Sequence, residues 1–343
     1  MSRNDAYSAL VAAQRRPGRE STDGSLDLPE LVRLGTLAAS SHNTQPWRFR
    51  LRDRALDILP DFSRRCPVGD PDDGHLFKSL GCAAENIVQA AAAQGHAADV
   101  VFDPRSKTVH VALSRSKAVR PGELFHAIPR RQCTRTRYQG RAIAPPQMAL
   151  LEAAGRGDRV RTRLIDDPGL RDAIVDQVRE GDLAQLSDRA FRRELMTWLR
   201  FNDAAAIETG DGLATRPAGQ PSLPDWLAKR VLRFVLTGRS QANTDAVNIR
   251  SSPLIAVVAA SDDRPAAWIE AGRAYQRLAL QATALGIRTA FINQPIEVRA
   301  LRPRLSTLLG LVDEIPLLML RLGFAPEAPF SLRRPVSDVI LQG

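Results

Sequence analysis

The sequence predicts an α+β protein that contains two tandem copies of one helix-and-sheet unit. Three observations lead to this prediction: identities within the chain at a single offset, helical and strand-like patterns that recur in both halves, and an ordinary globular composition. The 343 residues are enough for two ordinary domains or one large duplicated one. Hydrophobic residues make up 44% and charged residues 25%, as in typical soluble globular domains.

Two segments of the chain match each other when one is shifted by 191 positions, since 272 − 81 = 191. Each segment combines an alanine-rich helix, a terminal glycine, a short apolar strand and a proline that stops the strand. Chance similarity between two helix–glycine–strand units is the alternative. Duplication is favoured because the identities share one gap-free offset: Asp72 and Asp263, Gly81 and Gly272, Ala83 and Ala274, Ala91 and Ala282, Ala93 and Ala284, Gly95 and Gly286, and Pro104 and Pro295.

Periodicity places the remaining elements along the chain. We expect helices at residues 30–39, 81–93, 146–154, 182–202 and 272–284. We expect strands at residues 47–51, 109–113, 254–260, 289–292 and 316–322. The runs 254–260 and 316–322 are continuously apolar, which predicts strands at the centre of a sheet covered on both faces.

The copies are expected to span residues 1–120 and 121–343. Between residues 203 and 248 glycines and prolines crowd together, which is typical of a loosely ordered segment. This stretch is either a lid or insertion over a site in the second copy or a surface connection.

Charge and cysteine content narrow the function classes. The net charge is +10, but the basic residues are interspersed with acids and aromatic residues make up only 5%, so nucleic-acid binding is not expected. No apolar run is long enough to span a membrane. The histidines are isolated, and the three cysteines lack metal-ligand spacing and a disulfide framework: Cys66, Cys82 and Cys133. A cytoplasmic protein without a metal site is therefore expected.

A polar segment with the sequence ASSHNTQPW occupies residues 39–47, between a predicted helix and a predicted strand. It resembles the flavin-binding signature of the nitroreductase family, and it is particularly similar to the mycobacterial Acg-type group. Hydroxyl and amide groups can both donate to and accept from the polar edge of a flavin. The resemblance implies a nitroreductase-like fold and contacts with FMN from Ser40, Ser41, Asn43 and Gln45. Ala39 replaces the proline of the family signature.

Two arginine-containing segments resemble the part of the family that holds the FMN phosphate. Residues 130–135 have the sequence RRQCTR and match an Arg-x-Ser-x-Arg pattern, with cysteine in place of serine. A guanidinium group suits phosphate because it donates two parallel, charge-assisted hydrogen bonds. The resemblance assigns this role to Arg131, Cys133 and Arg135. Near the C-terminus, Arg333 and Arg334 are similar to the family's basic pair that closes on the phosphate.

A third segment, NQPIE at residues 293–297, follows the predicted strand 289–292. It resembles the Pro-Ile-Glu loop that lies over the flavin in nitroreductases, with the glutamate N–H directed at the flavin N5 atom. Val298 replaces the glycine that is usual after this loop. The resemblance implies FMN contacts from Asn293, Pro295, Ile296 and Glu297.

The motifs are divided between the copies. Nitroreductases are two-fold dimers with flavins at the interface, and here the Asn43 segment occurs only in the first copy. The phosphate arginines and the Pro-Ile-Glu loop occur only in the second. One complete site can be assembled, so we expect one FMN per chain and a monomer that mimics the family dimer.

The resemblance implies an oxidoreductase that passes hydride from NAD(P)H through FMN to a small electron-poor acceptor, such as a nitroaromatic or a quinone. The flavin carries the chemistry, and no catalytic acid or base of the protein is assigned. The alternative is an FMN storage or sensing protein with a covered site and little turnover.

Overall fold

Two four-stranded antiparallel sheets form the framework of the protein in a computed structural model that describes residues 3–21 and 23–342. The first sheet contains β1 (Trp47–Arg52), β2 (Ala55–Pro60), β3 (His96–Asp103) and β4 (Thr108–Arg115) in the order β1-β2-β4-β3. The second contains β5 (Val160–Ile165), β8 (Leu254–Ala260), β9 (Arg288–Phe291) and β10 (Ile315–Gly323) in the order β5-β8-β10-β9. In each sheet the first, second, fourth and third strands of the copy lie next to one another in that order. This shared topology confirms the α+β class and the two-copy arrangement.

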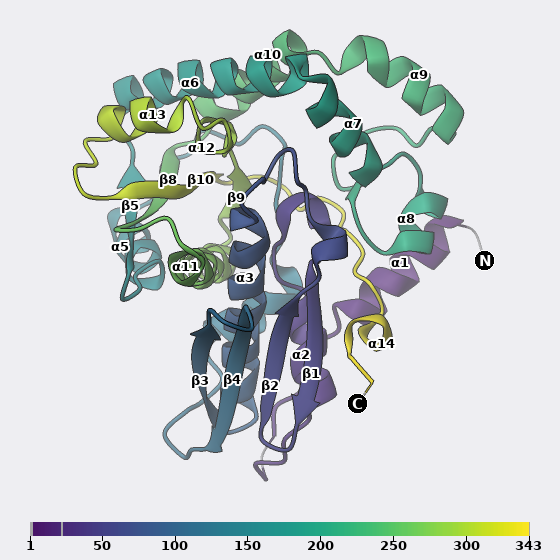
Figure 1. Cartoon of the computed structure of the whole chain (residues 1–343), viewed down its shortest axis with the longest axis vertical. Helices are drawn as coiled ribbons and strands as arrows, with labels where there is room; N and C mark the ends of the chain where they lie inside the picture. Colours follow the sequence, from purple (N-terminus) through teal and green to yellow (C-terminus); the bar gives the residue numbers. More distant parts are fainter. Residues whose placement is uncertain (1–2, 22, 343) are drawn as a thin grey trace.

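Two long helices, α3 (Gly74–Ala93) and α11 (Pro265–Ala284), lie side by side between the sheets (Figure 1). A Cβ atom added to Gly81 would lie 2.0 Å from the carbonyl oxygen of Ile269, and one added to Gly272 would lie 1.9 Å from that of Lys78. The two contacts exchange under the offset of 191, since 78 + 191 = 269. Such reciprocal contacts define a two-fold interface, here within one chain. Glycine at both positions lets the helix backbones touch.

Polar side chains repeat this symmetry further along the same two helices. Arg277 donates to Glu85 over 2.8 Å, and Gln276 donates to Asn86 over 2.7 Å. These pairs also exchange under the offset, since 85 + 191 = 276 and 86 + 191 = 277. Glu85 and Asn86 are buried, so an unpaired partner would leave a costly orphaned group between the copies.

The copies differ most between their first two strands. β1 and β2 form a tight hairpin, whereas residues 166–253 separate β5 from β8. This insertion holds α6 (Pro168–Ser187), α7 (Arg189–Trp198), α8 (Asp203–Thr209), α9 (Asp225–Val235) and α10 (Gly238–Arg250), with the short strands β6 (Leu199–Arg200) and β7 (Leu213–Ala214). It crosses the top of the molecule in Figure 1 and extends outward to α9.

The single helix expected at residues 182–202 is wrong. The chain leaves α6 at Asp188, whose backbone is extended (φ −74°, ψ 123°) and whose carboxylate accepts from the N–H of Ala190 as the cap of α7. The apolar spacing continues through this break, so periodicity alone does not reveal it. An N-cap carboxylate contributes about 1 kcal/mol to the new helix.

The apolar runs predicted at the centre of a sheet are confirmed. Every residue of β8 is buried, and every residue of β10 except Ile315 is buried. The remaining helices are α1 (Arg3–Gln14), α2 (Leu28–Thr36), α4 (Glu123–Ala127), α5 (Pro145–Ala154), α12 (Gln294–Glu297), α13 (Arg302–Leu308) and α14 (Val336–Val339). Among the described residues, none of these or the other helices has the length and apolar character to span a membrane.

Candidate functional site

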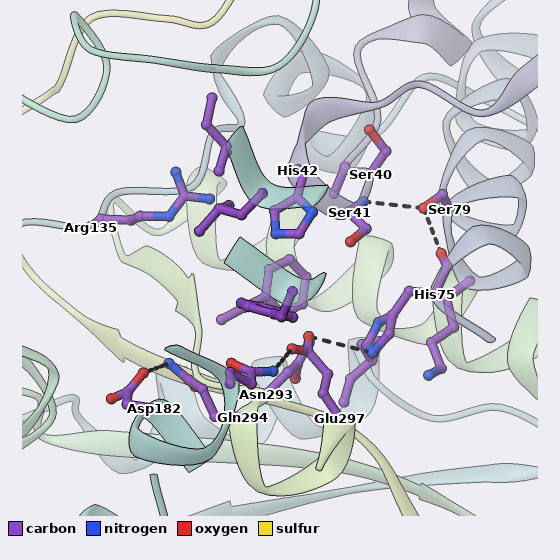
Figure 2. A pocket seen from close by; sticks show the side chains of 18 of the residues that line it. Ser40, Ser41, His42, His75, Ser79, Arg135, Asp182, Asn293, Gln294 and Glu297 are labelled. Atoms are coloured by element: carbon purple, nitrogen blue, oxygen red, sulfur yellow. Dashed lines mark hydrogen bonds and ion pairs between the residues drawn. The ribbon is translucent and has the colours of Figure 1, made fainter. Parts of the chain in front are cut away.

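A cavity of about 250 Å³ lies where the two copies meet. Ser40, Ser41 and His42 of the first copy form one wall, and Asn293, Gln294 and Glu297 of the second copy face them across the cavity (Figure 2). Helix α3 contributes His75, Lys78 and Ser79. Apolar side chains from the insertion close another side: Leu186, Phe191, Leu195, Leu213 and Leu236. The site therefore draws on both copies and on residues 166–253.

The first-copy wall is a strained loop. His42, Asn43 and Gln45 have φ values of 47°, 55° and 53°, a left-handed conformation that residues other than glycine rarely adopt. Each such residue costs of order 1–3 kcal/mol and persists only where surrounding contacts impose it. Ser40 supplies one of these contacts by accepting from the backbone N–H of Gln45 over 3.0 Å.

Asn43 and Gln45 supply the other contacts. The Asn43 amide donates to the carbonyl oxygens of Gly212 and Leu332, and the Gln45 amide donates to that of Gly210 over 2.9 Å. Neither side chain lines the cavity, whereas Ser40 and Ser41 do. The Asn43 and Gln45 side chains thus fix the loop geometry, and their contact with a cofactor stays a prediction. Trp47, which follows the loop, is fully buried in the core.

The second-copy wall is the start of α12. The carboxamide oxygen of Asn293 accepts from the N–H of Met319 over 2.8 Å, which ties the wall to β10. Pro295 and Ile296 of the same helix are buried and do not line the cavity. Glu297 reaches the cavity with its side chain and accepts from Gln185 of α6 over 2.7 Å.

The predicted phosphate segment runs beside β9. Cys133 forms a parallel bridge with Thr289, and the N–H of Thr134 donates to Thr289 over 2.9 Å. Arg135 is exposed and lines the cavity. Arg131 does not line the cavity; it is buried and donates to the carbonyl oxygen of Leu37 over 3.0 Å. The structure thus places the two arginines of this motif in different surroundings.

Three buried arginines gather beside the cavity: Arg15, Arg131 and Arg333. Each is at most 8% exposed, and every hydrogen bond found for their guanidinium groups goes to a backbone carbonyl. In residues 3–21 and 23–342 no carboxylate pairs with any of the three, and Nε of Arg131 has no partner. Burial and mutual repulsion lower the pKa of Arg15, and they lower that of Arg333 to about 9. An anion would relieve this uncompensated charge.

Arg15 was not anticipated from the sequence. It lies just after α1, and its guanidinium donates to the carbonyl oxygens of Pro129 and Arg131 over 2.8 and 3.1 Å. No local motif marks it, because its partners are more than 100 residues away. Arg334, in contrast, contacts the strained loop: its N–H donates to the Gln45 side chain over 2.9 Å.

A carboxyl pair lies on the insertion side of the cavity. The amide nitrogen of Gln294 donates to Asp182 of α6 and to Asp245 of α10, each over 3.0 Å. Burial raises the pKa of both carboxyls, and the charge of Asp245 raises that of Asp182 further. Two adjacent buried carboxyls cannot both ionise cheaply, so the pair retains a proton.

This pair predicts a pH-dependent stability. At pH values between the two pKa values, Asp182 keeps its proton in the folded protein but has lost it in the unfolded chain. The contribution of this group to the free energy of unfolding is therefore full below the ordinary carboxyl pKa and is lost as the pH rises. We expect Asp182→Asn to gain stability relative to the native protein as the pH rises from about 4 to about 7. Urea titrations across this range measure the difference, with the exposed Asp176→Asn of α6 as the control. A difference that does not change with pH contradicts the assignment.

Two further groups in or near the cavity are uncharged at neutral pH. Burial lowers the pKa of His42 to about 4 and raises that of Cys66 to about 12. Their ring nitrogen and sulfur lie 3.6 Å apart, a contact between a neutral imidazole and a thiol. Because a thiolate is the reactive form of cysteine, this pair does not supply a nucleophile.

The fold and the cavity define an internally duplicated α+β protein with a cavity at the junction of its copies and a cluster of buried arginines beside it. The nitroreductase family model matches residues 170–324. "Putative NAD(P)H nitroreductase Rv3131" of Mycobacterium tuberculosis is 29% identical over 323 residues, covering 90% of each chain. "Putative NAD(P)H nitroreductase acg" of the same species is 26% identical over 326 residues, covering 90% of this chain and 93% of that protein.

Residues 170–324 are thus similar to the nitroreductase family, and the chain is similar along most of its length to these two mycobacterial proteins. Among solved structures it resembles the FMN-dependent nitroreductase NfnB from Mycobacterium smegmatis in complex with NADPH. The identity is 16% and the TM-score is 0.39, with 64% of this chain and 98% of that chain covered.

Proposed function

We propose that this protein is an FMN-binding oxidoreductase that transfers hydride from NAD(P)H through FMN to an electron-poor acceptor such as a nitroaromatic or a quinone. The observation that carries the proposal is the carboxylate-free arginine cluster beside the cavity between the copies. The similarity to the nitroreductase family supports the reaction class, because the curated relatives carry the name NAD(P)H nitroreductase.

The donor set fits the two ends of FMN. Arg333 donates to the carbonyl oxygens of Leu37 and Ala38, directly before Ala39 and Ser40, which line the cavity. A phosphate held by the cluster would thus lie at the edge of the cavity, and the unpartnered Nε of Arg131 is a ready donor to it. The Ser40 and Ser41 hydroxyls and the Arg135 guanidinium remain for the polar edge of the ring system.

Bound FMN would supply reversible two-electron chemistry by accepting and releasing a hydride. The protein's part is to bind, orient and exclude water. Phe191, Leu195 and Leu213 of the insertion shield the cavity from solvent, which strengthens electrostatic interactions inside it. A cationic group such as Arg135 at the ring edge would favour the anionic reduced form.

We propose that residues 1–120 and 121–343 supply opposite walls of one site, so that the protein works as a monomer. The expected result is one FMN per chain, measured by the visible spectrum of the purified protein and a flavin-to-protein ratio. Addition of NADPH or NADH should then bleach the flavin absorbance. A protein that takes up no FMN rejects the proposal, and two flavins per chain contradict the single split site.

One observation favours a second candidate, an FMN storage or sensing protein with little turnover. The cavity of about 250 Å³ is below the roughly 300–1,000 Å³ of typical ligand pockets, and the insertion covers it. Residues 203–248 contribute Leu213, Leu236 and Gln241 to its wall, so we propose that this stretch is a lid. Bound FMN that neither nicotinamide reduces would support storage or sensing.

A further inference from the structure

Two cavities share one wall of side chains. A second, small cavity of about 20 Å³ lies behind the main one and has room for about one water molecule. His75, Lys78 and Glu297 line both cavities. The outer side of the small cavity is formed by charged residues, including Asp72 and Arg299, which are exposed or nearly so and pair with each other. His75, Lys78 and Glu297 therefore lie between the main cavity and the surface.

Glu297 has the contacts of a group that exchanges protons. One carboxylate oxygen accepts from Gln185 over 2.7 Å, and the other lies 3.6 Å from Nε2 of His75 (Figure 2). Burial raises the pKa of Glu297 to about 7, and the charge of Asp70 adds to this effect. A carboxyl group with this pKa is present in both protonation states near neutral pH, which is the best condition for a general acid.

The groups behind Glu297 can return a proton to it. Burial lowers the pKa of Lys78 to about 8, so its ammonium also exchanges protons near neutral pH. A Cβ atom added to Gly74 would lie 3.6 Å from both Nζ of Lys78 and Oδ1 of Asp70, so these two groups share one corner of the small cavity. Burial and the Lys78 charge keep His75 neutral by lowering its pKa.

Other charged and titratable groups around Glu297 come from every neighbouring element. They are Cys66 and Asp70 before α3, His75 and Lys78 on α3, Asp182 on α6, Asp245 on α10, Asp263 before α11, and Arg302 on α13. Arg302 is paired with Asp263 over 2.5 Å, and the carboxylate of Asp70 accepts from the N–H groups of His75 and Leu76. Glu297 is thus the carboxyl that both borders the main cavity and has a route outward.

We propose that Glu297 delivers the proton that a hydride acceptor requires, and that His75 and Lys78 connect it to water in the small cavity. The inference rests on the proposed function, which supplies the hydride and its two electrons from the reduced cofactor. With a quinone, the hydride reduces the acceptor and the O–H bond of Glu297 breaks as an O–H bond forms on the quinone oxygen. The glutamate then regains a proton from water, and the product is a hydroquinone.

The test compares a quinone, whose reduction consumes protons, with ferricyanide, which accepts electrons alone. Native protein, Glu297→Gln and the exposed Glu180→Gln are reduced with NADPH and mixed with either acceptor. We expect Glu297→Gln to slow quinone reduction about a hundredfold and to remove its pH dependence near neutrality. Its ferricyanide rate and flavin content should match those of the native protein, as should all properties of Glu180→Gln.

Lys78→Met provides a second variant in case glutamine at position 297 disturbs folding. It should slow quinone reduction and spare ferricyanide reduction in the same way. Equal losses with both acceptors, or no loss with either, overturn the proposal. Native protein that binds no FMN overturns the proposed function instead, so the two failures are distinguishable.

A measurement without turnover checks the same assignment. The infrared carbonyl band of a protonated carboxyl should weaken as the pH rises from about 6 to about 8. The difference between native protein and Glu297→Gln isolates the Glu297 band from those of Asp182 and Asp245. A difference spectrum that shows no protonated carboxyl at about pH 6 contradicts the donor role.

Discussion

Gly272→Val is expected to destabilise the protein by at least about 3–5 kcal/mol, because its first added carbon would lie 1.9 Å from the carbonyl oxygen of Lys78. The obstructing atom belongs to the backbone of α3, so no side-chain rotation can relieve the clash. Separating α3 from α11 would also expose the buried pairs between the copies. The free energy of unfolding, from urea titration followed by circular dichroism, measures the effect.

Gly122→Ala is the matched control. An added Cβ at Gly122 meets nothing within 4 Å, and the backbone there is extended (φ −117°), so a change below about 1 kcal/mol is expected. Gly81→Val should behave like Gly272→Val, since its added carbon would meet Ile269 of α11 at 2.0 Å. If both valine variants kept native stability, the two helices would not be in the close contact that defines the pseudo-two-fold interface.

Arg131→Ala is expected to weaken FMN binding by roughly 10- to 150-fold, because a charge-assisted hydrogen bond contributes about 1.5–3 kcal/mol. Arg131 is buried and has one unpartnered nitrogen, whereas Arg105 is exposed on the turn after β3. Arg105→Ala therefore serves as the control and should keep native affinity. Flavin fluorescence titration of the apoprotein measures both.

Riboflavin separates a phosphate contact from a general loss of structure. Riboflavin lacks the phosphate, so Arg131→Ala should change its affinity little, and the same should hold for Arg15→Ala. Equal effects of Arg131→Ala and Arg105→Ala on FMN would reject the assignment of the cluster to phosphate. An equal loss for FMN and riboflavin would point instead to collapse of the site.

The duplication could be predicted from the sequence because its interface depends on local residue types. Gly81 and Gly272 match at one offset since both positions tolerate only the smallest residue against a backbone carbonyl. The apolar runs of β8 and β10 were likewise visible, because strands buried on both faces cannot carry polar residues. A motif with a specific spacing predicted flavin contacts for Ser40 and Ser41, and both residues line the cavity.

Other parts of the site depend on contacts between distant segments, which no local pattern encodes. Arg15 follows α1 in the chain but contacts Arg131, more than 100 residues away. Asp182 of α6 and Asp245 of α10 lie on different helices of the insertion and accept from the same Gln294 side chain. The motif also could not reveal that the side chains of Asn43 and Gln45 turn away from the cavity. Their role follows from carbonyl groups at Gly210, Gly212 and Leu332, far along the chain.

Joining the two copies in one polypeptide changes how the interface can evolve. In a homodimer every substitution appears on both sides of the symmetry axis, so its effect is doubled and no side can specialise. Here the positions equivalent under the offset, such as Glu85 and Gln276, carry different residues and form different bonds. The insertion of residues 166–253 likewise exists in one copy only. Each half can therefore accumulate its own changes, and one half is free to lose ligand contacts that the other must retain.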